Sequence, residues 1–448
     1  MLVLKTLIKL GMPDITFEYI KEKWNHAGFQ KYFQNMSWMF AGRIFIMVIA
    51  FVINAYMARY LGPKNYGLLN YTFSFVGLFS FIASLGIDSV INREIIKDHS
   101  KKDQIVGTSF FLKIFGSFLA MISILIAARL TTNDPLLLGL ISMYSFVYIC
   151  NAFGVIDTYF QSQALSKYPT IVMMSVGVLT TILKIIVVSS HAGVIWLVGV
   201  YTFESFTSAF GLLYLFVSQG HSFKKWVFDG KIAKMILHDS LPLILSSVAV
   251  TIYMDIDQIM IKNMMSSEAL GIYAVAVKLS EAWYFIPGVI SASVFPAIVN
   301  ARKVSKELYE KRFMKLYSLM FWLSTSIALL TTIFASLIIH IIYGYQYLGA
   351  VTALQIYVWA GVAVSLGFVL GQYLIAENYT QISAVGAVVG AVTNVVLNII
   401  FIPKYGINAA AVATFISYTL ATFSVLFFKK TRPHLKVIIR SIIPNFNS

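Results

Sequence analysis

The chain has 448 residues, of which 58% are hydrophobic and only 12% are charged. A soluble domain is usually about 45–50% apolar and about 25% charged, so this composition disfavours a soluble enzyme, a nucleic-acid-binding protein and a disordered chain. The single cysteine, Cys150, leaves neither a disulfide within the chain nor a cysteine metal site. We therefore expect an all-α integral membrane protein, because lipid offers no partner to unpaired backbone groups.

Twelve apolar stretches of about 20 residues, the length that crosses a bilayer as a helix, follow one another along the chain. Pro287 is expected to kink the eighth, and Gly386-x-x-x-Gly390 predicts close helix packing in the eleventh. The predicted spans cover residues 37–58, 68–91, 106–128, 136–159, 170–189, 194–217, 241–262, 271–296, 316–339, 351–375, 382–402 and 408–428.

The segments outside these spans are short and rich in basic residues. Residues 1–36 predict a cytoplasmic segment that lies on the membrane surface, because Phe17, Ile20 and Trp24 alternate there with charged residues. Residues 218–240 predict a cytoplasmic linker with an interfacial helix, and residues 429–448 form a basic cytoplasmic tail.

The net charge of +15 follows from how Lys and Arg are distributed along these segments. With the N-terminus in the cytoplasm, 25 of them fall in inner segments, 5 in outer loops and 4 within spans. Such an excess orients a membrane protein. We therefore expect a multi-pass protein of the cytoplasmic membrane with both termini in the cytoplasm. Its basic runs meet anionic lipid heads, and no nucleic-acid partner is needed to explain them.

Two pairs of similar segments divide the chain into halves. Residues 61–70 and 265–274 match at an offset of 204, and each pair member places a glycine at the start of an even-numbered span. Residues 161–168 and 372–379 match at an offset of 211. The matches predict two six-helix bundles in the same orientation, related by a pseudo-two-fold axis along the membrane normal. Parallel repeats of this kind form one transporter architecture, with the substrate between the halves. The predicted bundles are 37–217 and 241–428.

Ten ionisable side chains lie within the predicted spans. Each costs about 2.5–3.5 kcal/mol at the bilayer centre, so together they would cost roughly 25–35 kcal/mol if they faced lipid, more than the stability of a typical protein. Most must therefore face a wet interior, pair with one another or lie near a span end. They are Arg43, Asp88, Lys113, Asp157, Lys184, Glu204, Asp255, Asp257, Lys278 and Glu281.

A structural role competes with a functional one at several of these positions. Asp88, Lys113 and Asp157 lie near predicted cytoplasmic span ends, where snorkelling or pairing explains them. Arg93 is a candidate partner for Asp88, and Lys184 is long enough to snorkel outward.

The acids of the seventh span are candidates for ion coupling. Asp255-Ile-Asp257 has the form of a D-x-D metal motif, but in a helix the two carboxylates point about 200° apart. A proton or sodium site at one of them is the functional interpretation, with Asp255 as the deepest acid, and packing against polar groups of a neighbouring helix is the alternative. Lys278 and Glu281, three residues apart, are suited to a salt bridge.

Two stretches carry a family resemblance. Residues 59–67, Arg-Tyr-Leu-Gly-Pro-Lys-Asn-Tyr-Gly, and the following 79–88 resemble the first two spans of the polysaccharide-biosynthesis flippases. Residues 268–281 resemble the junction of spans seven and eight in that family. The flippases move undecaprenyl- or dolichyl-phosphate-linked oligosaccharides such as O-antigen units. Their superfamily also contains multidrug and toxin extrusion antiporters and lipid II flippases, the latter usually with fourteen spans.

The resemblance implies a V-shaped pair of bundles, alternating access, and a cationic lumen that attracts a pyrophosphate-linked lipid. Arg and Lys in a partly desolvated cavity bind such an anion strongly. The chain itself lacks a P-loop, so the coupling ion, if one is used, is H⁺ or Na⁺. On this chain the cationic positions are Arg43, Lys184 and Lys278, the sugar-binding positions Asn54, Gln258 and Glu204, and the ion-coupling candidates Asp255, Asp257, Asp88 and Glu281.

The favoured function is therefore a flippase for lipid-linked oligosaccharides, which makes and breaks no bond. The expected partners are its lipid-linked substrate, membrane lipids and polysaccharide polymerase or glycosyltransferase machinery. One alternative is a cation-coupled exporter of small amphipathic molecules, although the cationic positions would repel drug cations. Another is a membrane-embedded glycan polymerase or ligase, which normally needs a sizeable outer loop with catalytic groups.

Overall fold

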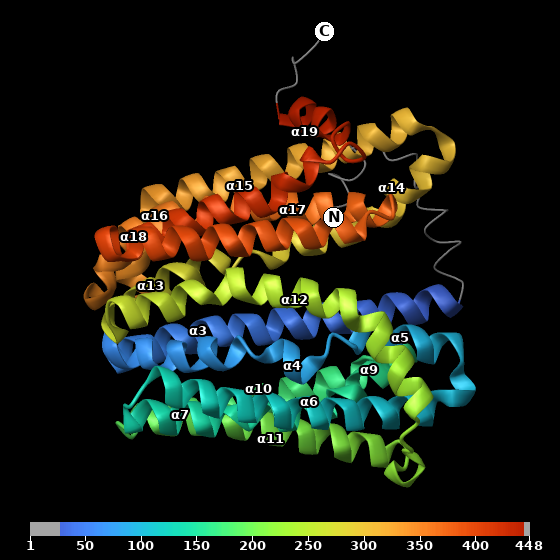
Figure 1. Ribbon diagram of the computed structural model, residues 1–448, viewed down its shortest axis with the longest axis horizontal. Helices are drawn as coiled ribbons and strands as arrows, with labels where there is room; N and C mark the ends of the chain where they lie inside the picture. Colours follow the sequence, from blue (N-terminus) through green and yellow to red (C-terminus); the bar gives the residue numbers. More distant parts are fainter. Residues whose placement is uncertain (1–26, 443–448) are drawn as a thin grey trace.

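The computed structural model describes residues 27–442, and every regular element in that range is a helix (Figure 1). The N half comprises α3 (Ala27–Gly77), α4 (Ser80–Ser84), α5 (Asp88–Lys97), α6 (Lys102–Thr131), α7 (Pro135–Ser145), α8 (Val147–Asn151), α9 (Val155–Ser162), α10 (Lys167–Ser189) and α11 (Val194–Ser218). The C half comprises α12 (Gly230–Met264), α13 (Ser267–Glu281), α14 (Phe285–Val304), α15 (Lys306–Tyr343), α16 (Val351–Tyr357), α17 (Ala360–Ala376), α18 (Thr380–Phe423) and α19 (His434–Ile442). Figure 1 shows the N half as the lower stack and the C half as the upper one.

Eight helices of the described part are long and apolar enough to cross a membrane, or nine if the bent pair Tyr345–Tyr357 and Ala360–Ala376 forms one span. The count differs from the predicted twelve partly because α3 and α18 each contain two helical arms. Gly62 (φ 69°) and Gly406 (φ 65°) interrupt them in a conformation that favours glycine. The two arms of α18 pack side by side, since a Cβ on Gly386 would lie 2.4 Å from the carbonyl oxygen of Ala421.

Local chemistry places the helix ends. Asp229 accepts the backbone N–H groups of Lys231 and Ile232 at the start of α12. Ser266 and Ser305 cap α13 and α15 in the same way. The predicted kink near Pro287 is present as the break between α13 and α14. Proline lacks an N–H and its ring clashes with the carbonyl four residues earlier, so the helix is interrupted at Ala282–Tyr284.

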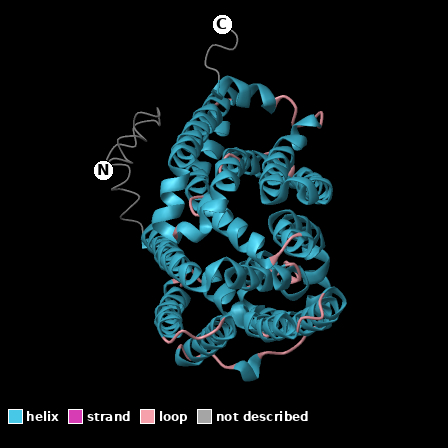
Figure 2. Cartoon of the chain, turned by 90° about the vertical axis from the view of Figure 1, so that its left-hand side faces the viewer, coloured by secondary structure: helices cyan, strands magenta, loops and turns pink. Residues whose placement is uncertain are grey.

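The largest hydrophobic cluster joins the two halves at one end of the molecule. This cluster includes Met57, Tyr66, Tyr273, Tyr343 and Tyr347, and contains side chains from both halves. Of two further clusters, one, from Ile87 to Ile236, combines the N half with the start of α12, and the other, from Ile298 to Ile438, lies within the C half. Figure 2 looks onto the joined end and shows the helices of both halves nearly end-on. We call this the closed end, and it carries the loops predicted to lie outside.

A reciprocal glycine contact lies at the centre of the closed end. A Cβ on Gly67 of α3 would lie 1.7 Å from the carbonyl oxygen of Ser267, and a Cβ on Gly271 of α13 would lie 1.9 Å from that of Pro63. Real Cβ atoms do not approach this closely, so only glycine permits the two backbones to touch. Gly67 and Gly271 are the glycines that matched at an offset of 204 in the sequence.

Polar contacts between the halves surround this crossing. Arg59 donates from Nε to the carbonyl oxygen of Ile342 at 2.8 Å and from its guanidinium to that of Ile341, at the end of α15. A cation at a helix C-terminus is favourable because the last carbonyls there are unpaired. Tyr347 donates its hydroxyl to the carbonyl oxygen of Ala58 at 2.7 Å.

The linker differs from the predicted interfacial helix over 218–240. Residues 219–229 contain only one short turn, Phe223–Lys225, and α12 begins at Gly230 and continues as one helix to Met264. Trp226 does not lie on a helix surface, because its ring packs against Phe110 at 5.0 Å and Phe216 at 5.4 Å between centroids. The predicted surface helix at the N-terminus lies mostly outside the described residues, and residues 27–36 form the start of α3.

Candidate functional site

The N half encloses a cavity of about 720 Å³, within the roughly 300–1,000 Å³ typical of ligand sites. Residues of α5, α6, α9, α10 and α11 line it. Four charged side chains are among them, Asp88, Lys113, Asp157 and Glu204. A cavity lined by ionised groups inside apolar helices stays wet and is the first candidate for a polar cargo.

Asp88 and Lys113 form an ion pair on one wall of this cavity. Lys113 donates to Asp88, and Thr158 donates its hydroxyl to the same carboxylate at 3.3 Å. The Lys113 side chain is 6% exposed and that of Asp88 is 53% exposed, so the acid faces the cavity and the lysine lies behind it. The candidate pairing of Asp88 with Arg93 is wrong, because Lys113, for which the sequence leaves snorkelling or pairing open, is the partner of Asp88.

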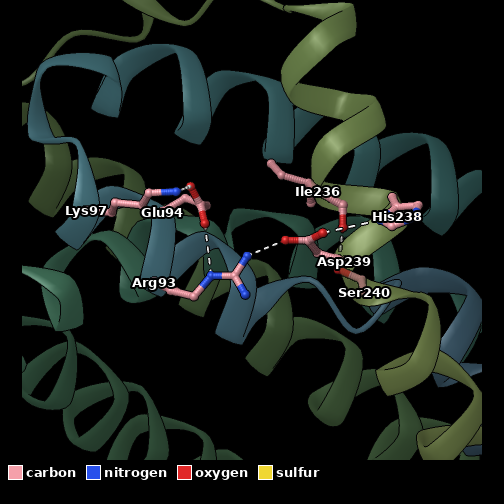
Figure 3. Close-up of polar contacts among 7 residues, drawn as sticks. All are labelled: Arg93, Glu94, Lys97, Ile236, His238, Asp239 and Ser240. Atoms are coloured by element: carbon pink, nitrogen blue, oxygen red, sulfur yellow. Dashed lines mark hydrogen bonds and ion pairs between the residues drawn. The ribbon is translucent and has the colours of Figure 1, made fainter.

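Arg93 instead links the first turns of α12 to the N half (Figure 3). Its Nε donates to Glu94 at 2.9 Å, and its guanidinium also donates to Asp239 of α12. The hydrogen bond from Arg93 holds the pKa of Asp239 below its usual range. Ala233 and Ile236, one turn earlier, belong to the hydrophobic cluster of the N half. The beginning of α12 therefore packs with the N half, although the rest of the helix belongs to the C half.

A second ion pair joins α10 and α11. Lys184 donates to Glu204 at 2.7 Å, and its Nζ lies 3.8 Å from the centre of the Tyr201 ring. The Lys184 side chain is only 6% exposed, so it does not snorkel outward. A carboxylate and an aromatic face stabilise a buried ammonium together. The sequence named Lys184 and Glu204 separately, and the structure brings them together.

Arg43 and Asn54 lie on the first arm of α3, outside the lining of the cavity. Arg43 is exposed and interacts electrostatically with Asp157, which accepts a hydrogen bond from Gln161 at 2.9 Å. The arm passes close to α10, because a Cβ on Gly42 would lie 2.2 Å from Thr170. Asn54 donates to the carbonyl oxygen of Ala50 within its own helix at 2.9 Å.

A group of charges lies where the two halves face each other. Asp255 approaches the N half, since its Oδ2 would lie 3.7 Å from a Cβ on Gly77. It interacts electrostatically with Lys278 and Glu281. In the described part of the chain, Lys278 and Glu281 form no ion pair within 4.0 Å, and Glu281 accepts the hydroxyl of Tyr357 at 2.9 Å. Lys278 is exposed.

Asp257 differs from Asp255, because it is buried inside the C half. The Tyr273 hydroxyl donates to Oδ2, the Thr414 hydroxyl donates to the same oxygen at 3.2 Å, and the backbone N–H of Gln258 donates to Oδ1 at 2.7 Å. Asn394 and Asn398 continue this network along α18, with a 2.8 Å bond between their amides. The sequence named Asp257 but gave no sign of its partners on α13 and α18.

Comparison with protein families gives one match. The model of a family described as "Polysaccharide biosynthesis protein" matches residues 32–302, more than half of the chain. An uncharacterized membrane protein of Methanocaldococcus jannaschii, MJ1068, is 30% identical over 156 residues. That stretch is 32% of this chain and 29% of the relative, so the match spans less than a third of either protein.

Solved structures share the fold at low sequence identity. An inward-facing multidrug resistance MATE family transporter of the MOP superfamily has a TM-score of 0.72 at 15% identity, over 88% of this chain and 96% of its own. The lipid II flippase MurJ in an inward closed conformation has a TM-score of 0.68 at 16% identity, over 93% and 94%. A MOP superfamily transporter from Pyrococcus furiosus, whose binding pocket is described as having reverse polarity, has a TM-score of 0.59 at 17% identity, over 91% of this chain and 94% of its own.

Proposed function

Because the chain belongs to the polysaccharide biosynthesis protein family, we propose that it is a flippase for prenyl-(pyro)phosphate-linked oligosaccharides in the cytoplasmic membrane. The flippase delivers its cargo for cell-surface glycan assembly by polymerase or glycosyltransferase machinery. It makes no bond, so its task is to hold a charged, sugar-bearing headgroup while that group crosses the apolar layer.

The charge pairing of the N-half cavity is the observation that carries this proposal. Each acid that lines it has a partner: Asp88 has Lys113, Glu204 has Lys184, and Asp157 has Gln161. A (pyro)phosphate carries more negative charge and more acceptor oxygens than a carboxylate, so Lys113 and Lys184 can turn from their carboxylates to an incoming phosphate in a site of low dielectric. The freed carboxylates are then acceptors for sugar hydroxyls.

The second candidate function is export of amphipathic cations, suggested by the multidrug resistance MATE family transporter that shares this fold. At 15% sequence identity, the similarity to that transporter shows a shared fold and does not extend to a shared cargo. A cavity for organic cations needs acids without a competing cation, whereas two of the three acids here are paired with lysines, Asp88 with Lys113 and Glu204 with Lys184, and only Asp157 has a neutral partner, the amide of Gln161. The cavity chemistry therefore supports the anionic cargo over the cationic one.

The proposed topology has twelve spans. The two arms of α3 and the two arms of α18 each supply a pair, α12 supplies one, and the remaining long helices supply the others. The reciprocal contact of Gly67 and Gly271 supports a pseudo-two-fold axis along the membrane normal. The closed end carries the loops with few basic residues and therefore faces outward in this topology. The opposite end of each half then faces the cytoplasm, and the N-half cavity is open inward.

Direction of transport is proposed to come from an ion at Asp257. A carboxylate, hydroxyls and amide oxygens are the ligand types that hard cations prefer, and Asn398 Oδ1 is buried without a hydrogen-bond partner among the described residues. Asp257, Thr414 and Asn398 would hold Na⁺, or Asp257 alone a proton. No group of three or more His, Cys, Asp or Glu in the described residues is suited to a transition metal.

The test is reconstitution of the full chain with a fluorescent lipid-linked oligosaccharide and measurement of its transfer across the bilayer. Arg43→Ala should reduce the rate more than 10-fold at normal protein abundance, because the exposed guanidinium is a phosphate-binding fork. Arg43→Lys should retain part of the rate, since it keeps the charge but not the fork. Arg129→Ala, at the far end of α6, is the matched control and should leave the rate unchanged.

Two outcomes would contradict the proposal. One is wild-type protein that moves no lipid-linked oligosaccharide but expels an organic cation such as ethidium, which would establish the exporter. The other is an Arg43→Ala variant with the wild-type transfer rate, which would remove Arg43 from the cargo path.

A further inference from the structure

The C half contains a cavity of its own, of about 550 Å³. It lies between α12, α17 and α18, and none of the described residues that line it is charged. Its walls include Tyr253, Met254, Phe368, Leu374 and Tyr418. A methionine and several aromatic rings form a surface that adapts to branched, apolar chains.

This cavity corresponds in position to the charged cavity of the N half. Gln161 lines the N-half cavity and Gln372 lines the C-half cavity, and the two glutamines begin the segments that match at an offset of 211. The two halves therefore present a cavity at related positions, one charged and one apolar. A cargo with one charged part and one apolar part matches this division.

The mouth of the apolar cavity lies beside the interface between the halves. Met254 and Phe368 at its edge are 38% and 40% exposed. The next residue along α12, Asp255, approaches Gly77 of the N half. A lipid whose headgroup occupies the N half thus has an apolar site within reach across the interface.

We propose that the C-half cavity binds part of the isoprenoid chain of the lipid carrier while the N-half cavity binds its phosphate and sugars. This proposal rests on the proposed function. In this arrangement the protein, and not the surrounding bilayer, holds that part of the isoprenoid chain. The benefit is physical: a wet, inward-open space between the halves would expose the chain to water, and the apolar cavity removes it from water.

Three glycines make the test possible, because a Cβ on each would meet nothing within 4 Å. Gly371 lines the C-half cavity and Gly154 lines the N-half cavity. Gly139 lies exposed on α7 and lines neither. Replacement of each by Phe fills one cavity, the other, or none, without a clash at the Cβ.

The experiment measures binding of two probes to the purified full chain in lipid nanodiscs: undecaprenyl phosphate, with a long chain, and geranyl phosphate, with a short one. Gly371→Phe should weaken undecaprenyl phosphate binding at least 10-fold and change geranyl phosphate binding less than 2-fold. Gly154→Phe should weaken both, and Gly139→Phe neither. Thermal unfolding of each variant verifies that it is folded.

Each other outcome has a definite meaning. Equal weakening of both probes by Gly371→Phe, or none, overturns the inference while the proposed function stands. If Gly371→Phe loses co-purified phospholipid but keeps undecaprenyl phosphate, the cavity holds an ordinary bilayer lipid and the inference is wrong. Wild-type protein that binds neither probe overturns the proposed function, and with it this inference.

Discussion

The N half and the C half place their buried charge in opposite ways. In the N half, Lys184 pairs with Glu204 beside an open cavity, where a cargo can reach the acid. In the C half, Asp257 is enclosed by Tyr273 and Thr414 behind an apolar cavity that it does not line. One bundle design therefore accommodates two chemistries, because the framework depends on glycine contacts and apolar packing while the cavity linings vary independently.

The difference also concerns how each charge is stabilised. A buried ion pair roughly offsets its own desolvation, and loss of one partner leaves an uncompensated charge. A carboxylate in a network of neutral hydrogen-bond donors depends on every donor and is sensitive to the protonation or ligation of the carboxylate itself. The N-half pairs are thus suited to exchange partners with cargo, and the C-half network is suited to respond to an ion.

The largest expected effect tests the ion pair of the N half. Glu204→Leu should destabilise the protein by about 3–5 kcal/mol, because it leaves the 6% exposed Lys184 side chain without its carboxylate. The double change Lys184→Met with Glu204→Leu should recover most of that stability yet remain unable to transport. Thermal unfolding of both variants and of Lys184→Met completes the double-mutant cycle. Strictly additive losses would mean that the pair is not coupled.

The next effect tests the network of the C half. Asp257→Asn should shift the Na⁺ or H⁺ concentration for half-maximal transport at least 10-fold, because it removes the only charge of the network in the described residues. Asp255→Asn is the matched control at the interface and should keep the dependence. The reverse result would restore Asp255, the deeper acid by sequence, as the coupling group.

The smallest effect compares two histidines that lie among aromatic rings, one in each half. His434 stacks on Tyr373 at 3.5 Å, and burial lowers its pKa to about 3. His221 packs against Phe216 at 4.9 Å, and burial also lowers its pKa. An unfolded histidine binds a proton below about pH 6.5, so the stability from a buried neutral His434 is complete above that pH and is lost as pH falls toward 3.

His434→Phe should therefore reduce the loss of unfolding free energy between pH 7 and pH 5 by up to about 1.4 kcal/mol per pH unit, and so flatten the fall of the melting temperature. His221→Phe should flatten it less, because His221 is less enclosed. Differential scanning fluorimetry across that pH range measures both. An unchanged slope for His434→Phe would indicate that His434 is already exposed when α19 is in place.

The sequence predicted the helices better than the site. The predicted span 194–217 corresponds to the helix α11, Val194–Ser218, since the length of an apolar stretch and the loop before it are local properties of the sequence. Asp88 pairs with Lys113 of α6 and not with Arg93 of its own helix, because Arg93 bonds to Asp239 of α12, a long-range contact that spacing does not predict. The network around Asp257 joins three helices and includes Thr414, which is 157 residues away in sequence. At that separation, the spacing of residues cannot predict which side chains meet.

The glycine crossing at the closed end has a consequence for ancestry. Gly67 contacts Ser267, and Gly271 contacts Pro63, so each half supplies the same two surfaces to the other. A contact of this kind is isologous, the type that two identical subunits make about a two-fold axis. In the proposed two-fold arrangement, a single half would have assembled as a closed dimer before its gene was duplicated and fused. After fusion each copy was free to change its cavity, while neither glycine could change without its counterpart's backbone moving.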